Sequence, residues 1–325
     1  MSPGSPQPAP AAAEPFGTRL VAAMDAHGPL CVGIDPHPGL LAAWGLTDDV
    51  RGLREFSHRV LDAVGGRVAA VKPQSALFER HGAAGVAVLE EVVAAGRATG
   101  TIVIVDAKRG DIGSTMAAYA DAYLRDGAPL AGDALTVSAY LGFGSLAPAI
   151  EAALATGRGL FVLALTSNPE GAAVQHAVPP EAVLGSGPTG APGPAGGGSV
   201  AGMIAAAAGA LNAAELARTG GELGSVGLVV GATTGTAAAR LGIDLGAVRG
   251  PLLAPGVGAQ GAGPAELVAV FGAARRAVLA ASSRAVLAAG PDPDRLRAAA
   301  RQAADDAAGA LRANPPPSRV AFRAP

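Results

Sequence analysis

The sequence predicts a single (β/α)8 barrel, and three observations carry that prediction. Eight short runs rich in Val, Ile and Leu recur along the chain. Each run is followed by a polar turn and a longer segment of good helix formers. The runs are continuously apolar rather than alternating, as expected for parallel strands covered on both faces. This count fits a barrel, whereas a doubly wound sheet, the alternative fold, usually has fewer strands.

The expected strands follow one another along most of the chain. They occupy residues 30–35, 68–73, 101–108, 134–139, 160–166, 226–233, 251–258 and 277–283. Two helical segments between them, 85–100 and 199–221, are rich in alanine and end at glycine, a typical helix stop. The final helix, about 293–313, begins beside Asp292 and Asp294, and either carboxylate is placed to cap it. We therefore expect the barrel to span residues 17–313.

Three segments fall outside this alternation. Residues 1–16 are rich in Pro, Gly and Ala and are expected to form a disordered leader. Residues 314–325 are expected to form an extended C-terminal tail. Residues 185–198, "GSGPTGAPGPAGGG", have the composition of a flexible loop. This loop is either a tolerated surface insertion or part of a mobile lid after the fifth strand, and the sequence leaves both interpretations open.

Composition argues against several classes of function. The net charge is −2 and the pI is about 6.2, so no basic surface indicates nucleic acid or an anionic membrane. The mean hydropathy is +0.36, but the longest apolar run, "VAGMIAAAAGAL", is shorter than the roughly 20 residues of a membrane span. The N-terminus lacks the pattern of a secretion signal. We expect a cytoplasmic protein.

The single cysteine, Cys31, rules out a disulfide framework and fits a reducing compartment. It lies inside the apolar run "LCVGI". A small buried hydrophobic residue is therefore a better interpretation than a nucleophile.

Charged residues gather at the ends of the first three expected strands. Asp35 closes the first strand, Lys72 closes the second, and Asp106 and Lys108 close the third, in a chain that is only 15% charged. Residues two apart on a strand share a face, and neighbouring strands lie about 4.8 Å apart, so these charges can meet at one rim. Opposite charges placed together keep one another ionised. Because burying four charges without a purpose is costly, we predict an active site there rather than a purely structural salt-bridge network.

A glycine-rich loop follows the seventh strand. The segment "APGVGAQGAG" places Gly256, Gly258 and Gly261 in G-x-G-x-x-G spacing. Its position late in the chain, with no acidic residue closing the next strand, argues against dinucleotide binding. Barrels often bind phosphate with the loops after strands seven and eight, where glycine lets backbone N–H groups approach the anion. We expect Gly258 and Gly261 to line such a site.

These segments together resemble a known family. "DAKRGDIGST", with "VGIDPH" and "VKPQ", resembles orotidine 5′-phosphate decarboxylase, particularly its longer bacterial form, from about residue 17 to residue 312. The resemblance implies conversion of orotidine 5′-monophosphate to uridine 5′-monophosphate and carbon dioxide, in de novo pyrimidine synthesis, without a cofactor. It also implies a homodimer with shared active sites.

The resemblance implies roles for the charged residues of the third strand and its loop. Lys108 would give a proton to carbon 6 of the pyrimidine as carbon dioxide leaves, and Asp106 would sit against the departing carboxylate. Asp111 would complete the charge network by reaching across the dimer interface into the partner's site. Thr115 would likewise reach the ribose of the partner's nucleotide.

For the rest of the substrate, the resemblance implies further contacts. Asp35 and Lys72 would hold ribose hydroxyls, with Lys72 also linking the charges. Gln260 would bridge the phosphate and the base, and Arg284 would bind the phosphate. Ser283 stands where many shorter members have a glycine, which puts one backbone contact to the phosphate in question.

At the fifth strand, "ALTSNPEG" resembles the segment whose hydroxyl reads the pyrimidine amide. That hydroxyl would belong to Thr166 or Ser167, and the sequence does not choose between them. The neighbouring Asn168 is as readily a turn former.

Two other functions stay open. A sugar-phosphate aldolase resembling 3-hexulose-6-phosphate synthase shares D-x-K-x-x-D but uses magnesium, and "VKPQSALFE" offers no extra acidic residue before Glu79. No H-x-x-x-H, C-x-x-C or acidic triplet predicts a metal site. The other alternative is a phosphate-ligand binding protein that has lost its chemistry, against which the complete set of charged residues argues.

Overall fold

The computed structural model describes residues 13–179, 198–257 and 261–312. Several predictions lie outside the described residues: most of the leader, residues 185–197 of the Gly/Pro loop, Gly258, Gln260 and the C-terminal tail.

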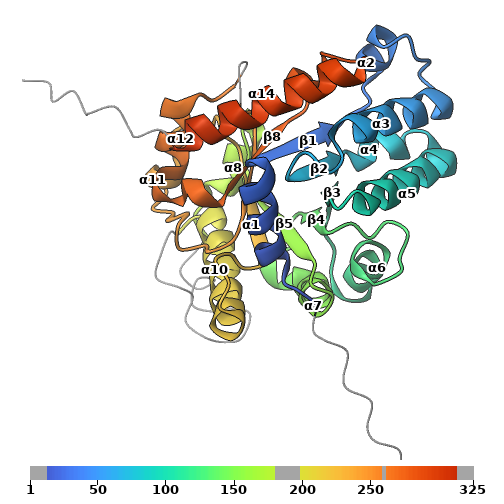
Figure 1. The fold of residues 1–325 in the computed structure, drawn as a ribbon. Helices are drawn as coiled ribbons and strands as arrows, with labels where there is room; N and C mark the ends of the chain where they lie inside the picture. The colour runs from blue at the N-terminus through green and yellow to red at the C-terminus, as the bar shows by residue number, and fades with distance from the viewer. Residues whose placement is uncertain (1–12, 180–197, 258–260, 313–325) are drawn as a thin grey trace, which may run out of the picture.

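Eight parallel strands form a closed barrel in the order of the sequence, and β1 pairs with both β2 and β8 (Figure 1). The strands are β1 (Leu30–Ile34), β2 (Ala70–Pro73), β3 (Ile102–Arg109), β4 (Ala134–Val137), β5 (Gly159–Leu165), β6 (Val226–Val230), β7 (Leu252–Pro255) and β8 (Val278–Ser282). Each lies within or next to one of the apolar runs. The prediction of a (β/α)8 barrel is therefore confirmed, and the doubly wound alternative is wrong.

Helices surround the barrel, and Figure 1 shows α14, α3 and α5 following one another along one side. The α-helices are α1 (Phe16–His27), α2 (Pro38–Ala43), α3 (Val50–Val64), α4 (Ser75–Glu79), α5 (Gly82–Ala98), α6 (Gly113–Leu124), α7 (Ala147–Ala155), α8 (Ala172–Gln175), α10 (Val200–Thr219), α11 (Ala237–Arg240), α12 (Pro264–Phe271), α13 (Arg284–Leu287) and α14 (Pro293–Arg312). Three short 3-10 helices are η1 (Phe143–Leu146), η2 (Pro169–Gly171) and η3 (Gly272–Ala277).

The ends of two expected helices have clear local causes. Helix α10 ends at Gly220, whose φ of 70° is left-handed and is adopted by glycine without strain. Helix α14 is capped by Asp292 and not by Asp294. The Asp292 carboxylate accepts the backbone N–H groups of Asp294 at 3.0 Å and Arg295 at 2.9 Å.

Helix α1 fills the amino-terminal end of the barrel. Phe16 is fully buried and meets Phe161 of β5 edge to face, with ring centroids 5.9 Å apart. Leu20 and Met24 from the same helix join this inner cluster. A β-carbon at Gly159 would lie 2.1 Å from the Phe16 ring, so β5 needs glycine at the position where α1 packs against it. The functional cavity is consequently built at the opposite, carboxyl-terminal end.

Helix α10 is long and apolar enough to cross a membrane by length and composition alone. In this fold half of it is buried, and it packs against β5 and β6. Its buried Asn212 side chain binds the backbone of Val226 and Val248, and its buried Glu215 accepts the backbone N–H and the hydroxyl of Ser225. These polar contacts tie α10 to the barrel as a core helix.

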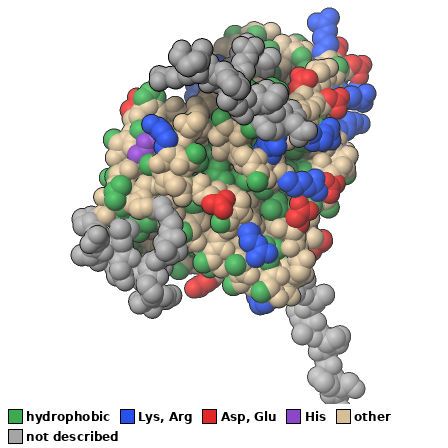
Figure 2. All heavy atoms as spheres, turned by 90° about the vertical axis from the view of Figure 1, so that its left-hand side faces the viewer, with side chains coloured by type: hydrophobic (Ala, Val, Ile, Leu, Met, Phe, Trp, Pro, Cys, Tyr) green, Lys and Arg blue, Asp and Glu red, His purple; other side chains and the backbone are tan. Residues whose placement is uncertain are grey.

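The outer surface mixes charges of both signs. On the face shown in Figure 2, basic and acidic side chains lie interspersed along the upper right edge, and hydrophobic side chains, other uncharged side chains and backbone cover much of the rest. This agrees with a net charge of only −2.

Candidate active site

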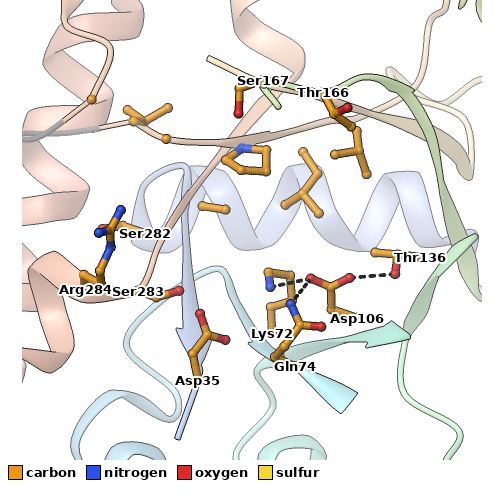
Figure 3. Close-up of a pocket in the computed structure, with 18 of the residues that line it drawn as sticks. Asp35, Lys72, Gln74, Asp106, Thr136, Thr166, Ser167, Ser282, Ser283 and Arg284 are labelled. Atoms are coloured by element: carbon orange, nitrogen blue, oxygen red, sulfur yellow. Dashed lines mark hydrogen bonds and ion pairs between the residues drawn. The ribbon is translucent and has the colours of Figure 1, made fainter. Parts of the chain in front are cut away.

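A cavity of about 480 Å³ opens at the carboxyl end of the barrel. The residues that line it come from nearly every strand end (Figure 3). They are Asp35, His37, Lys72, Gln74, Asp106, Lys108, Thr136, Leu163, Thr166, Ser167, Asn168, Val229, Gly231, Leu253, Pro255, Gly256, Val257, Gly261, Ala281, Ser282, Ser283, Arg284 and Ala285.

Asp106 is the centre of the charged side of this cavity. Its Oδ2 accepts from Lys72 Nζ at 2.7 Å and from Gln74 Nε2 at 3.2 Å. Its Oδ1 accepts from Lys108 Nζ at 2.6 Å and from Thr136 Oγ1 at 2.8 Å. The carboxylate thus has four donors, two of them cationic, and it is fixed in orientation.

Electrostatics keep this cluster charged. Burial alone would raise the pKa of Asp106, but the charges of Lys72 and Lys108 and their hydrogen bonds lower it to about 2. Burial alone would lower the pKa of Lys72, but the negative charges of Asp106 and Asp35 outweigh that effect, and the pKa lies above its usual value. At neutral pH both groups are therefore ionised although their side chains are 9% and 8% exposed.

The end of β3 is less regular than the sequence suggests. Val105 pairs with Leu135 and Arg109 pairs with Val137, so β3 holds two more residues than β4 between these partners. Lys108 has a left-handed φ of 48°, rare for a residue with a β-carbon, and its N–H donates to Thr136 Oγ1 at 2.9 Å. Asp106 and Lys108 do face one cavity, but through this irregular turn and not through simple strand alternation.

Asp35 lies apart from the ion pairs around Asp106. Its Oδ1 is buried and has no hydrogen-bond partner among the described residues. Gly33, two residues earlier, leaves room for the Ser283 hydroxyl: a β-carbon at position 33 would lie 1.9 Å from Ser283 Oγ and 3.0 Å from Asp35 Oδ2. Asp35 lines the cavity, and its carboxylate has spare capacity to accept a hydroxyl donor from a ligand.

The two candidate hydroxyls at β5 differ in their environment. Thr166 Oγ1 donates to Asn168 Oδ1 at 2.6 Å and accepts from Gln175 Nε2 at 2.7 Å. Ser167 has no such partner within the described chain, and Figure 3 shows it across the cavity from Asp106. The Ser167 hydroxyl is thus the freer of the two.

The remaining predicted residues of the phosphate end lie beside β7 and β8. Arg284 begins α13, and its side chain makes no hydrogen bond or ion pair within the part of the chain that the structure describes, so its guanidinium is available. Gly256 has a φ of 88°, and its carbonyl accepts the N–H of Ala262 at 2.8 Å. A β-carbon at Gly261 would lie 1.9 Å from that carbonyl oxygen. These two glycines shape the loop on either side of Gly258 and Gln260.

Asp111 and Thr115 do not line the cavity. Asp111 Oδ1 accepts the N–H of Ile112 at 2.8 Å within its own loop. Thr115 is exposed on α6. Within one chain, the structure does not bring these two residues to the other predicted site residues.

Two partners of Asp106 are not among the site residues predicted from the sequence. Gln74 directly follows β2, and Thr136 is a single polar residue inside the apolar strand β4. His37, two residues after Asp35, also lines the cavity. The composition also points to this cluster: of the 24 lysines and arginines in the chain, Lys72 and Lys108 are the only lysines.

Two other kinds of catalytic group, a cysteine nucleophile and a metal ion, can be compared with the structure. Cys31 is fully buried, and burial raises the pKa of its thiol to about 12, so it is not a thiolate nucleophile at neutral pH. Within residues 13–179, 198–257 and 261–312, no three His, Cys, Asp or Glu side chains gather as a metal site would require.

A closed barrel with a lysine–aspartate–lysine cluster at its carboxyl rim and an arginine lining the same cavity defines a (β/α)8 enzyme with a site for a small anionic ligand. Residues 28–185 match the model of the orotidine 5′-phosphate decarboxylase / HUMPS family. The chain is 56% identical to the orotidine 5′-phosphate decarboxylase of Streptomyces coelicolor, over 88% of this chain and 95% of that one. The chain belongs to the orotidine 5′-phosphate decarboxylase family.

Two other proteins extend this finding. The orotidine 5′-phosphate decarboxylase of Salinispora arenicola is 57% identical over 92% of this chain and 99% of its own. A crystal structure from Streptomyces avermitilis, described as an orotidine 5′-phosphate decarboxylase, superimposes with a TM-score of 0.82 at 56% identity and covers 92% of this chain and 97% of that one. The similarity therefore extends over nearly the whole fold.

Proposed function

We propose that this chain decarboxylates orotidine 5′-monophosphate to uridine 5′-monophosphate in de novo pyrimidine biosynthesis. The observation that carries the proposal is the Asp106 carboxylate, held between the ammonium groups of Lys72 and Lys108 at 2.7 and 2.6 Å beside the cavity. Relatives that carry this activity in their names are more than half identical to the chain, which supports it.

The charged cluster suits this reaction. The bond between carbon 6 of the pyrimidine and its carboxylate breaks, carbon dioxide leaves, and the electron pair stays on the ring carbon. Lys108 Nζ gives a proton to that carbon and regains one from solvent. Fixed cations stabilise the developing negative charge, and the Asp106 carboxylate holds both lysine side chains in place. No cofactor is needed for these steps.

The rest of the cavity suits the nucleotide. We assign the base contact to Ser167, because the Thr166 hydroxyl is already engaged by Asn168 and Gln175. The Asp35 carboxylate, which lines the cavity, would accept a ribose hydroxyl. The guanidinium of Arg284 would bind the phosphate, together with Gln260 and the backbone around Gly258 and Gly261.

We also propose a homodimer with shared sites. Asp111 and Thr115 lie outside their own cavity, and the exposed apolar side chains Ile112, Tyr140 and Leu141 follow β3 and β4 nearby. A second copy covering this surface would bring Asp111 and Thr115 to its own nucleotide.

We further propose a cytoplasmic location and one barrel domain over residues 17–313. The helices from α1 to α14, which surround the barrel, support these domain limits.

One assay tests the activity. Purified protein added to orotidine 5′-monophosphate is expected to remove the orotate absorbance, and a chelator is expected to leave the rate unchanged. A rate that vanishes with chelator and returns with magnesium would favour an aldolase-like metal enzyme instead. Tight binding of 6-azauridine 5′-monophosphate without turnover would indicate a binding protein.

A further inference from the structure

Arg109 follows Lys108 but leaves the barrel in the opposite direction. Lys108 and Asp106 line the cavity, whereas Arg109 does not. Its side chain runs between α4 and α6, where it is 25% exposed. The last residue of β3 therefore joins the strand that carries the proton donor to two surrounding helices.

Contacts of three kinds hold this guanidinium. It forms an ion pair with Glu79 of α4 and donates to Tyr123 Oη of α6 at 3.1 Å. Its central carbon also lies 5.5 and 5.6 Å from the ring centroids of Tyr119 and Tyr123. Glu79 is itself held, since its Oε1 accepts from the buried Ser75 hydroxyl at 2.5 Å. We call Glu79, Arg109, Tyr119 and Tyr123 the Arg109 anchor.

The backbone beside this anchor is strained. Lys108 has a φ of 48°, a strained conformation for a residue with a β-carbon that persists only where its surroundings hold it. On the inner side, the Lys108 N–H is held by Thr136. On the outer side, the Arg109 carbonyl accepts from Ser138 N at 2.7 Å and its side chain is fixed by the anchor.

We propose that Arg109 is a positioning residue for the decarboxylation. By fixing the outer side of the strand end, it keeps the left-handed turn that aims Lys108 Nζ at Asp106 and the cavity. This inference rests on the proposed function, in which Lys108 delivers the proton. Arg109 itself does not line the cavity, so it acts through Lys108.

The kinetic test separates chemistry from binding. Arg109→Met should lower kcat roughly 10- to 100-fold, the loss expected when a reacting group moves by about an ångström. The Kd for uridine 5′-monophosphate should stay close to the wild-type value, because the nucleotide contacts are intact. Arg109→Lys keeps a charge for Glu79 but loses the planar contact with the tyrosines, and kcat should fall between the two.

Two matched variants complete the series. Tyr123→Phe removes one hydrogen bond and keeps the buried ring, so it tests the anchor even if Arg109→Met folds poorly. Arg80→Met is the control: Arg80 follows the same helix α4, pairs with Asp48 at 2.7 Å and does not line the cavity. Its kcat should match the wild type.

A readout independent of turnover comes from the composition. Since Lys72 and Lys108 are the only lysines, protein labelled with ¹³C at lysine Cε gives two lysine signals, which Lys108→Ala assigns. Arg109→Met and Tyr123→Phe should shift or broaden the Lys108 signal and leave the Lys72 signal in place. Arg80→Met should move neither.

Three outcomes would overturn the inference: a wild-type kcat in Arg109→Met and Tyr123→Phe, a lower kcat with an unchanged Lys108 signal, or parallel losses of kcat and nucleotide affinity. A wild-type protein that releases no carbon dioxide would instead overturn the proposed function. The lysine spectra would then still show whether the anchor holds Lys108.

Discussion

Lysines and arginines occupy different kinds of position in this chain. Its 24 basic residues include two lysines, and both are bonded to Asp106. An arginine guanidinium is never deprotonated in proteins, so it can pair with anions but cannot deliver a proton. An ammonium can do both. The two lysines therefore stand where proton transfer is proposed, and arginines such as Arg109 and Arg284 stand where a permanent charge suffices.

Lys108→Ala removes the proposed proton donor. Turnover should fall by at least about 10³-fold, within the range that general acid catalysis contributes. The folded barrel and its binding of uridine 5′-monophosphate should persist, because Lys108 is 46% exposed and supports no core packing. Steady-state decarboxylation, circular dichroism and nucleotide titration measure these effects. Near-normal turnover would refute the assigned role.

Asp106→Asn tests the electrostatics of the cluster. At pH 7 it leaves the buried Lys72 ammonium without its partner, which should lower the free energy of unfolding by about 3–5 kcal/mol. The pKa of Asp106, about 2, lies below its usual value of 3.8, so its ionised form stabilises the fold above pH 4 and this stabilisation is lost as pH falls towards 2.

The difference between Asp106→Asn and wild type should therefore shrink between pH 4 and pH 2. Urea unfolding at several pH values measures it. Asp48→Asn, which breaks the exposed pair with Arg80, serves as control and should change stability little throughout. An equal difference between Asp106→Asn and wild type at pH 7 and pH 2 would mean that the charge of Asp106 is not what stabilises the site.

At the scale of elements, the strands were predictable because burial on both faces makes each one a continuous apolar run. The positions of Asp35, Lys72 and Asp106 followed from strand ends alone. The left-handed φ of Lys108 did not, because the groups that contact this turn, Thr136 and Glu79, lie far from it in the sequence. Single polar residues such as Gln74 gain meaning only when the fold brings them to a partner about 30 positions away.

The short helix α13 carries a prediction about the phosphate. Arg284 begins this helix at the cavity, and its guanidinium has no partner among the described residues. Arg284→Ala should weaken uridine 5′-monophosphate binding about 10- to 100-fold, the range for a charged hydrogen bond, and leave uridine binding nearly unchanged. Calorimetry with both ligands measures the split. Arg240→Ala on α11, outside the cavity, is the control, and equal losses for both ligands would place the phosphate elsewhere.

At the scale of the whole molecule, the two ends of the barrel make different contributions, one to stability and the other to function. The amino end is closed by Phe16, Leu20 and Met24 of α1, and the carboxyl end is left open for the site. This division is typical of barrels, in which stability and function reside at opposite faces. Changes at one end should therefore leave the other largely unaffected.

Phe16→Ala tests this separation. The ring is fully buried against Phe161 and Gly159, and its removal should lower the free energy of unfolding by about 3–5 kcal/mol. Below the lowered melting temperature, KM and kcat should stay near the wild-type values. Thermal unfolding and steady-state kinetics at low temperature measure the two effects. A large change in KM would show that the two ends are coupled.

The proposed dimer makes a prediction that no single chain can satisfy. If Asp111 serves the partner's site, Lys108→Ala and Asp111→Asn each damage every site of their own homodimers. A mixed dimer instead has one site with both groups intact, since Lys108 comes from one chain and Asp111 from the other. Equal mixing with subunit exchange should therefore restore about a quarter of the wild-type activity, because half of the dimers are mixed and each has one complete site.

The matched control for this mixture is Lys108→Ala with Asp106→Asn. Both residues lie in the same chain's cavity, so that each site of a mixed dimer lacks one of them and activity should not return. Sedimentation of the separate variants establishes that both are dimers before mixing. If the first mixture stays as inactive as its components although exchange is complete, Asp111 acts within its own subunit or not at all, and the sites are not shared through it.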